Sequence, residues 1–470
     1  MDRSQKIIIV GGCGTFGLST AWHLTKRGYT NVVCVDRWMF PSRSSAGFDR
    51  NKIVRTIYSQ PLYVKLAQEA VEMWKQPLFR GIFHQTGWVL GTSAPKLDTR
   101  LISSSNAISA AGTYDLLIEI HRQHGRTDQI ESLPDASAIH QKFPDFFSNT
   151  PGFRGIFDRN AGWVDSARAL EVVGQECQAA GVKFIVGPEG TVKSILKANV
   201  GNRPNQVIGV LMEDGSVLKG DKVILCAGAY TESLIDMEGQ VTAVAYSTAH
   251  VALTPHEMKR YKDMPVILIE GMGYTFPPDQ TGHIKFCDLH IGHPWKHSCL
   301  GRSQPVSLPR DKAYHETDTL PDEDAAEVRK FIQYCMPQFS NRPFTKSAMC
   351  WDTESFDFGW IVGPHPSSPD SLFLATAGSG HTFKNLPNAG KYVVDCLEGR
   401  LSKEHQDAWR QPEHFCKFLG LTAICLIRWR PDKVASAAPL ARVDLADLHG
   451  WNHDSQDKQH SSIYQPHSKL

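Results

Sequence analysis

The amino-terminal segment constrains the fold more than any other part of the chain. An apolar, β-branched run at residues 7–10 leads directly into a Gly-x-Gly-x-x-Gly pattern at 12–17. A helix-compatible stretch follows at 18–26, and a second strand at 32–35 ends in Asp36. In such a unit the first glycine permits a tight turn, the second lets the backbone approach a pyrophosphate, and the third allows close helix–strand packing. The segment therefore predicts a dinucleotide site.

The chemistry of this unit assigns its contacts. A diphosphate is expected on the helix N-terminus, where unpaired N–H groups and the helix dipole favour anions. The acid at the end of the second strand is placed to accept hydrogen bonds from ribose hydroxyls. The nucleotide contacts expected from this unit are Gly12, Gly14, Thr15, Phe16, Gly17 and Asp36.

A third strand of this kind comes late, in the run 222–231. In a nicotinamide-type domain the second half follows the first directly. Because well over a hundred residues intervene here, the pattern favours an α/β fold (α+β overall) with a discontinuous Rossmann-like, glutathione-reductase-type FAD domain and a second, β-sheet-rich substrate domain. The FAD domain is predicted at residues 1–95, 152–235 and 340–450, and the substrate domain at 96–151 and 236–339.

Composition excludes several classes of partner. Lys and Arg number 50 against 49 Asp and Glu, so no excess charge suggests nucleic acid or an anionic membrane. No apolar stretch approaches the length of a membrane span, and the first strand begins too early for a signal peptide. The 11 cysteines show no CxxC pair, which favours free thiols in a reduced compartment, and no cluster has metal-ligand spacing.

The chain ends in a polar stretch, 453–470, that closes with Ser468-Lys469-Leu470. A terminal Ser-Lys-Leu is read by the peroxisomal import receptor. We therefore expect a peroxisomal protein, with a cytoplasmic location as the alternative.

Several further motifs follow in a fixed order. They are Ser45-Ala46-Gly47 with Asn51-Lys52-Ile53, Gly162-Trp163-Val164-Asp165, Ile284-Lys285-Phe286-Cys287-Asp288, Met349-Cys350-Trp351-Asp352 and the run 379–387. Together with the glycine motif they resemble the fungal fructosyl amino acid oxidases, or amadoriases, which are related to monomeric sarcosine oxidase. The resemblance covers most of residues 5–410 and resumes at 428–452.

The resemblance implies an activity. Such an enzyme uses FAD to oxidise the C–N bond of a secondary amine attached to an amino acid. The amine loses hydride to the flavin, water hydrolyses the resulting imine, and O2 re-oxidises the flavin to give H2O2. The partners implied are the small-molecule amine and O2, for a monomeric protein with no nucleic acid and no membrane.

The resemblance also implies individual roles. Cys350 matches the cysteine that bonds covalently to the flavin 8α-methyl group, and Lys285 matches the lysine that activates oxygen, where a fixed ammonium favours formation of superoxide. Lys384, at the start of a helix expected at 384–397, matches a lysine that pairs with the substrate carboxylate. Arg55 lies three residues after Lys52, so that one helical turn would place both on one face, with Lys52 against the flavin and Arg55 on the carboxylate. The remaining cofactor contacts implied are Ser45, Gly380, His381, Phe383 and Lys384 itself.

One departure from the family pattern concerns the substrate. Where amadoriases have Lys-x-Cys-Asp-Glu, this chain has Leu289 in place of the glutamate that contacts the sugar. Leucine cannot accept a hydrogen bond, so a polyol facing it would lose one. A less hydroxylated substrate is therefore an equal alternative: an N-methyl or cyclic amino acid, a substrate of the sarcosine, pipecolate or saccharopine type, or a precursor in a natural-product oxidative cyclisation.

The second departure is an interruption at 411–428 within a segment that is continuous in amadoriases. The substrate-facing arginine of that segment could correspond to Arg410, Arg428 or Arg430. We interpret the stretch as an anomalous insertion, either genuine or an unspliced intron. Two alternatives of another class follow: a flavin-binding protein disabled by the insertion, or an NAD-dependent dehydrogenase.

Overall fold

The computed structural model describes residues 2–58, 61–92, 114–409 and 442–451, with short internal gaps. The gaps fall at 124, 127, 145, 148–149, 202, 290–291, 299–303, 312, 316–317 and 356–357. Three expectations lie outside the described residues: the insertion at 411–428, the arginines Arg410, Arg428 and Arg430, and the terminal Ser468-Lys469-Leu470.

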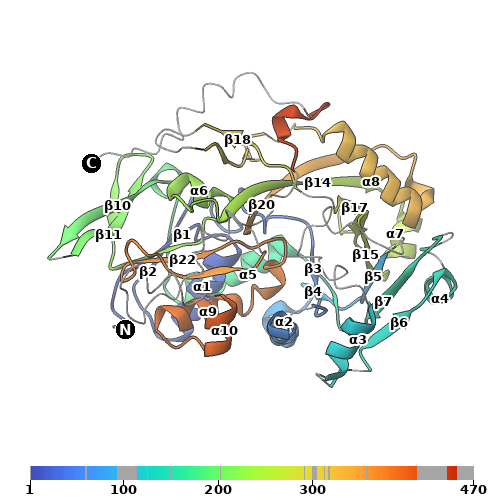
Figure 1. Cartoon of the computed structure of the whole chain (residues 1–470), viewed down its shortest axis with the longest axis horizontal. Helices are drawn as coiled ribbons and strands as arrows, with labels where there is room; N and C mark the ends of the chain where they lie inside the picture. The colour runs from blue at the N-terminus through green and yellow to red at the C-terminus, as the bar shows by residue number, and fades with distance from the viewer. Residues whose placement is uncertain are drawn as a thin grey trace.

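The glycine motif follows strand β1 of a six-stranded sheet (Figure 1). Its strands, in spatial order, are β21 (Ile361–Pro364), β22 (Leu372–Thr376), β13 (Lys222–Leu225), β1 (Ile7–Val10), β2 (Val32–Asp36) and β9 (Lys183–Val186). All neighbours run parallel except β21, which is antiparallel to β22. The two amino-terminal strands and the late third strand are thus confirmed as neighbours in one sheet.

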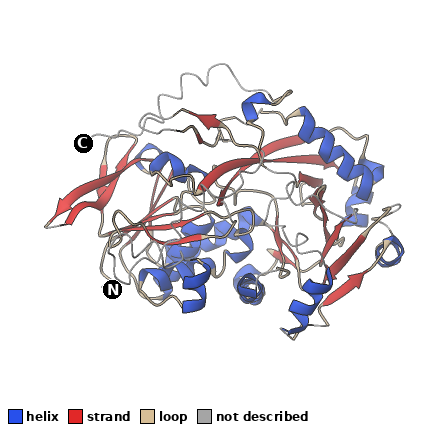
Figure 2. Ribbon diagram, viewed as in Figure 1, coloured by secondary structure: helices blue, strands red, loops and turns tan. Residues whose placement is uncertain are grey.

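The side chains of β1 point alternately to the two faces of this sheet, and both faces are buried. Ile7 and Ile9 pack with helices α1 (Thr15–Lys26), α5 (Ser166–Ala179) and α9 (Ala389–Leu397). Ile8 and Val10 pack on the opposite face against the small antiparallel sheet of β10 (Val192–Val200), β11 (Arg203–Met212) and β12 (Val217–Lys219). Figure 2 shows this grouping, with helices on one side and the β10–β11 hairpin extending from the other.

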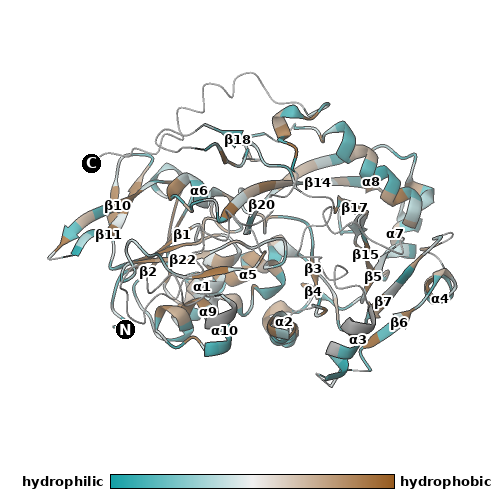
Figure 3. Ribbon diagram, in the orientation of Figure 1, coloured by the Kyte–Doolittle hydropathy of each residue, from teal (hydrophilic) through white to brown (hydrophobic). Residues whose placement is uncertain are grey.

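The second large sheet has eight strands. Their order is β20 (Lys346–Ser355), β14 (Val241–Ala252), β17 (His283–Asp288), β16 (Gly273–Thr275), β15 (Val266–Glu270), β5 (Trp88–Thr92), β7 (Arg154–Asp158) and β6 (Ile130–Leu133). Strand β14 is brown over most of its length in Figure 3, and most of its residues are buried. Helix α8 (Asp322–Cys335) covers one face, where Phe331 and Ile332 pack with Ile284 and Phe286 of β17. The predicted β-rich second unit is therefore present.

Segments predicted to belong to the FAD domain also contribute strands to the eight-stranded sheet. Strands β5, β7 and β20 pair within the eight-stranded sheet, although they come from the ranges 1–95, 152–235 and 340–450. The exact domain boundaries stay a prediction.

Two local predictions were wrong. Lys52 and Arg55 do not share a helical turn, because Lys52 begins the short strand β3 (Lys52–Val54), which pairs with β8 (Gly162–Val164), itself paired with β4 (Phe83–His84). The helix expected from residue 384 to 397 is divided into the 3₁₀ turn η8 (Phe383–Asn385) and α9. Helix α2 spans Pro61–Trp74.

The remaining described elements are short. They are η1 (Pro77–Phe79), α3 (Tyr114–Gln123), α4 (Ala136–Lys142), η5 (Gly187–Glu189), η6 (Gly228–Tyr230), α6 (Thr231–Leu234), α7 (Pro255–Tyr261), β18 (Lys296–His297), β19 (Val306–Ser307), η7 (Pro337–Phe339), α10 (Lys403–Ala408) and η9 (Leu445–Asp447).

Candidate active site

An elongated cavity of about 670 Å³ runs from the glycine turn of the six-stranded sheet to the eight-stranded sheet. This volume is typical of ligand and cofactor pockets. Most predicted site residues line it: Gly14, Thr15, Phe16, Asp36, Ser45, Lys52, Arg55, Lys285, Cys350, Gly380, His381, Phe383 and Lys384. Gly12 and Gly17 do not line the cavity and lie behind it in the turn.

The glycine turn is shaped for close contact with a phosphate. A Cβ on Gly17 would lie 2.3 Å from Gly11 O, and a Cβ on Gly12 would lie 2.5 Å from Cys34 Cβ, so both glycines serve internal packing. The left-handed residue of the turn is Gly11, with φ of 73°. Gly14 is the N-cap of α1 and provides no side-chain cap, so the helix N-terminus is available to an anion.

Asp36, at the end of β2, lines the cavity beside the glycine turn. Its carboxylate accepts hydrogen bonds from Cys13 N (3.1 Å), Trp38 N (3.2 Å) and Ser42 Oγ (2.7 Å). Burial raises its pKa, while these donors favour the charged form. A carboxylate offers about four lone-pair sites, so one acceptor site remains for a ribose hydroxyl. The residues at this end fit the nucleotide part of FAD.

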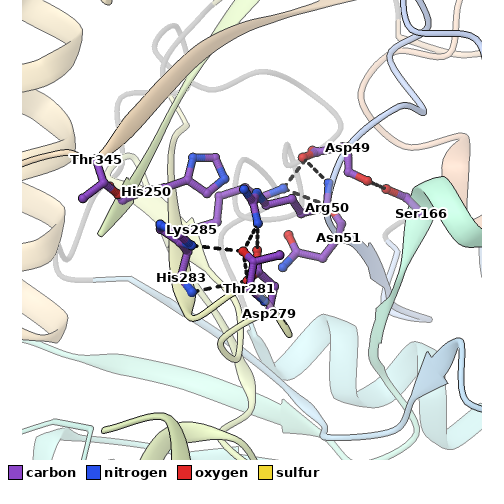
Figure 4. Close-up of polar contacts among 10 residues, drawn as sticks. All are labelled: Asp49, Arg50, Asn51, Ser166, His250, Asp279, Thr281, His283, Lys285 and Thr345. Atoms are coloured by element: carbon purple, nitrogen blue, oxygen red, sulfur yellow. Dashed lines mark hydrogen bonds and ion pairs between the residues drawn. The ribbon is translucent and has the colours of Figure 1, made fainter. Parts of the chain in front are cut away.

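At the end of the cavity beside β17, the Asp49 carboxylate is shared by two lysines, and Figure 4 shows its contact with one of them, Lys285. Asp49 Oδ2 is 2.8 Å from Lys285 Nζ and 3.0 Å from Lys52 Nζ. Lys285 Nζ also donates to Asn51 O at 2.9 Å and lies 4.5 Å from the Phe276 ring centroid. Lys285 is 2% exposed, so its ammonium is a fixed, largely dehydrated charge on the cavity wall.

Cys350 lies next to this cluster on β20. Its Sγ is 3.8 Å from both Lys52 Nζ and Ala46 O. Burial disfavours the charged form of Lys52, but Asp49 and Cys350 outweigh it and raise the Lys52 pKa above its usual value. Among the described cysteines, Cys350 alone is half-buried and the others are buried. Cys226 also lines the cavity but is buried, so Cys350 is the more exposed of the two thiols there.

Two further buried cations, Arg55 and Lys384, also line the cavity. Arg55 Nη1 donates to Ile57 O at 2.7 Å, and Lys384 Nζ donates to His381 O. Burial lowers the pKa of both side chains, and Arg55 adds to the lowering at Lys384. Both groups can therefore gain from an incoming carboxylate.

Three residues implied by the resemblance, Ser45, Gly380 and His381, line the cavity and make hydrogen-bond contacts with neighbouring residues. Ser45 Oγ accepts from Gly47 N at 2.9 Å, and Gly380 N donates to Asp352 Oδ2 at 2.6 Å. His381 Nε2 lies 2.9 Å from Phe358 O, and burial and Lys384 lower its pKa well below the usual value. Leu289 is buried and lines the same cavity as Leu268 and Phe276.

Some residues of the site were not anticipated in these roles. No sequence pattern points to Asp49 as the shared counter-ion or to Tyr58 as a neighbour of both cavity cations. The contact of Arg37 with Asp311 (2.9 Å) at the nucleotide end was also missed, because 274 positions separate the two residues. Only the order Asp49, Lys52, Arg55 in one short segment could have suggested a charge cluster.

The described part of the chain shows neither a helix suited to cross a membrane nor a cluster of metal ligands. No helix there has both the length and the apolar character that a bilayer crossing requires. In the same ranges, no three His, Cys, Asp or Glu side chains come together as ligands for a metal ion.

Comparisons with known proteins agree with this geometry. The family described as "FAD dependent oxidoreductase" matches residues 6–396. L-saccharopine oxidase of Schizosaccharomyces pombe is 30% identical over 87% of this chain and 94% of its own. Monomeric sarcosine oxidase of an Arthrobacter species is 22% identical over 80% of this chain and 88% of its own. The structure of fructosyl peptide oxidase from E. terrenum matches with a TM-score of 0.82 at 34% identity, covering 97% of this chain and all of that one.

The chain belongs to the FAD-dependent oxidoreductase family. The expectation of an FAD-dependent oxidase that acts on the CH–NH groups of amino-acid-derived amines is thereby confirmed. The cavity fits this cofactor: a glycine turn and uncapped helix N-terminus at one end, and fixed charges with an accessible thiol at the other.

Proposed function

We propose that this chain oxidises a secondary amine that carries a carboxylate and few hydroxyl groups, as saccharopine does, with O2 as the electron acceptor. The observation that carries the proposal is the composition of one cavity, which combines the buried cations Arg55 and Lys384 with an apolar wall that includes Leu289. The cations suit a carboxylate, whereas the leucine leaves a sugar hydroxyl without a partner.

The chain's own groups divide the work. Flavin, held by the glycine turn and the wall that carries Cys350, would supply the redox chemistry, which is acceptance of a hydride from the carbon beside the amine nitrogen and transfer of two electrons to O2. Arg55 and Lys384 hold the substrate carboxylate and so fix the direction of the reacting C–H bond. Lys285 supplies a positive charge where the reduction of oxygen builds negative charge. Water then hydrolyses the imine product, and H2O2 leaves.

We further propose that Cys350 carries the flavin through an 8α-S-cysteinyl bond. Its half-buried Sγ on the cavity wall, 3.8 Å from Lys52 Nζ, supports this assignment. Purified protein precipitated in acid should keep its yellow colour, and Cys350→Ser should release the colour to the supernatant. Release from the wild type would remove the covalent bond from the proposal.

The substrate class is tested by a panel of amines. H2O2 release is measured with saccharopine, sarcosine, pipecolate and a fructosyl amino acid. We expect the highest kcat/KM for an amine without a sugar. Preference for the fructosyl compound, which the 34% identity to a fructosyl peptide oxidase favours, would overturn this. No peroxide with any amine, in protein that carries flavin, would support an inert flavin-binding protein.

Localisation and assembly are separate proposals. Ser468-Lys469-Leu470 supports import into peroxisomes, where catalase can remove H2O2. A fluorescent fusion to the amino terminus should be punctate, and removal of Leu470 should disperse it through the cytoplasm. We also propose a monomer, which sedimentation would show as a species of about 52.4 kDa.

A further inference from the structure

We propose that Tyr58 is a positioning residue for substrate binding: its aromatic ring holds Arg55 and Lys384 together as a receptor for one carboxylate. This inference rests on the proposed function, because it assigns a role within the carboxylate site. Tyr58 follows Arg55 by three residues, just after β3, whereas Lys384 comes from η8 on a distant part of the chain.

The geometry places one ring next to both cations. The Arg55 Cζ atom is 4.3 Å from the Tyr58 ring centroid, and Lys384 Nζ is 5.2 Å from it. Cations within about 6 Å of a ring centroid are attracted by the electron density of its face. Arg55 and Lys384 line the cavity and Tyr58 does not, so the ring lies behind the two groups that would meet the substrate.

The ring offsets the energetic cost of keeping two positive charges buried side by side. Two buried positive charges repel each other, and dehydration penalises each of them. A substrate carboxylate relieves this repulsion only when it is bound. An aromatic face stabilises both cations without competing for the carboxylate, because it offers no charged acceptor. The site therefore stays organised between catalytic cycles.

The ring, and not the hydroxyl, is the functional part of Tyr58. Within the described chain, the buried hydroxyl oxygen of Tyr58 has no hydrogen-bond partner. Burial raises the pKa of this phenol to about 12, so the side chain is neutral in the physiological range. Neighbouring rings fix its position, since Tyr63 and His381 have ring centroids 5.6 Å and 5.8 Å from that of Tyr58.

The test compares Tyr58→Phe with Tyr58→Leu in the flavin-loaded enzyme. The first variant keeps the ring and removes the hydroxyl, and the second removes the ring. Binding of glutarate, an acid with no amine to oxidise, is followed through the flavin absorbance, and KM and kcat are measured with the best amine of the panel. Tyr29→Leu removes a buried tyrosine ring outside the cavity and controls for general loss of packing.

We expect Tyr58→Leu to weaken glutarate binding and raise KM by about tenfold, with a smaller change in kcat. Tyr58→Phe should stay within about twofold of the wild type, and Tyr29→Leu should bind glutarate normally. Equal weakening in Tyr58→Phe and Tyr58→Leu, or unchanged binding in Tyr58→Leu, would overturn the role of the ring. Wild-type enzyme that oxidises amines but ignores glutarate would overturn the carboxylate site and this role together. Wild-type enzyme that binds glutarate but oxidises no amine would instead overturn the proposed function alone.

Discussion

At the scale of single residues, one carboxylate oxygen determines the electrostatics of the site. Asp49 Oδ2 neutralises only one of the two lysines that it contacts, so the cluster with Lys285 and Lys52 keeps a net positive charge. Such a charge, held in place before the reaction, costs no reorganisation when a negative charge develops beside it. Lys285 is the member that is buried deepest and is therefore the one whose removal should affect oxygen chemistry most.

Replacing Lys285 tests this charge. Lys285→Met should slow re-oxidation of the reduced enzyme by O2 by about 10²-fold, because one preorganised charge is lost. Anaerobic reduction by substrate should change far less, and Lys285→Arg should retain most of the oxygen reactivity. Stopped-flow absorbance separates the two half-reactions. Equal slowing of both by Lys285→Met would contradict a specific role in oxygen reduction.

Leu289 offers a gain-of-function test of substrate choice. Leu289→Glu restores an acceptor on the apolar wall and should raise kcat/KM for a fructosyl amino acid, relative to an amine without a sugar, by about tenfold. Leu289→Met keeps the apolar character and a similar volume, so it should leave the ratio unchanged. The measurement is H2O2 release with both substrates for each variant. If Leu289→Met shifts the ratio as far as Leu289→Glu does, the missing acceptor is not what selects the substrate.

The family motifs point to Lys285, Cys350, Arg55 and Lys384, and all four line one cavity, while their individual roles stay predictions. The contacts that organise them were not found, because a short-range pattern carries no information on which loop lies opposite. Tyr58 and Lys384 are a clear case: a 3₁₀ turn far along the chain brings the lysine to the ring.

At the scale of elements, the error at β3 has a physical cause. The spacing of Lys52 and Arg55 suits a helix, but the residues between them, Ile53 and Val54, are β-branched and favour a strand. Pairing with β8 then settles the competition in favour of the strand. The strand–turn–helix at the amino terminus had no such conflict, because hydrophobic pattern and glycine spacing agreed, and it was predicted correctly.

The glycine turn allows a prediction about the element as a unit. A Cβ on Gly14 would have no neighbour closer than 3.5 Å (Ser45 Oγ), whereas a Cβ on Gly17 would lie 2.3 Å from Gly11 O. Gly14→Ala should therefore fold normally and lose flavin, because its methyl group projects toward the phosphate position. Gly17→Ala should lose flavin and also unfold more easily, by about 1–3 kcal/mol of unfolding free energy.

The two effects are separated in a Cys350→Ser background, from which flavin can be removed. Urea unfolding of the flavin-free proteins measures how far each added methyl group lowers the free energy of unfolding. The amount of flavin bound per chain measures how far it weakens flavin binding. Equal stability of the Gly14→Ala and Gly17→Ala proteins would show that the turn relaxes around the added methyl group.

At the scale of the whole molecule, the described carboxyl-terminal segment, 442–451, packs against the unit that contains the eight-stranded sheet. Leu445 N donates to Pro294 O (2.8 Å), Asp322 N donates to His449 O (2.9 Å), and Arg442 forms an ion pair with Glu354. Glu354 lies on β20, four residues after Cys350, and also accepts a hydrogen bond from Tyr246. Tyr246 pairs in register with Cys350 across β14 and β20, so this segment supports the wall of the cavity.

The ion pair between Arg442 and Glu354 provides the last prediction. The side chains are 11% and 2% exposed, so Arg442→Met leaves a buried carboxylate without its cation and should lower the free energy of unfolding by about 3 kcal/mol. Arg442→Met with Glu354→Leu removes both charges and should recover much of that loss. Arg203→Met is the control, since the Arg203–Asp370 pair is exposed and should contribute less than about 1 kcal/mol. Urea unfolding measures all three. A double variant as unstable as Arg442→Met alone would mean that the segment is held by its backbone contacts and that the buried charge adds little.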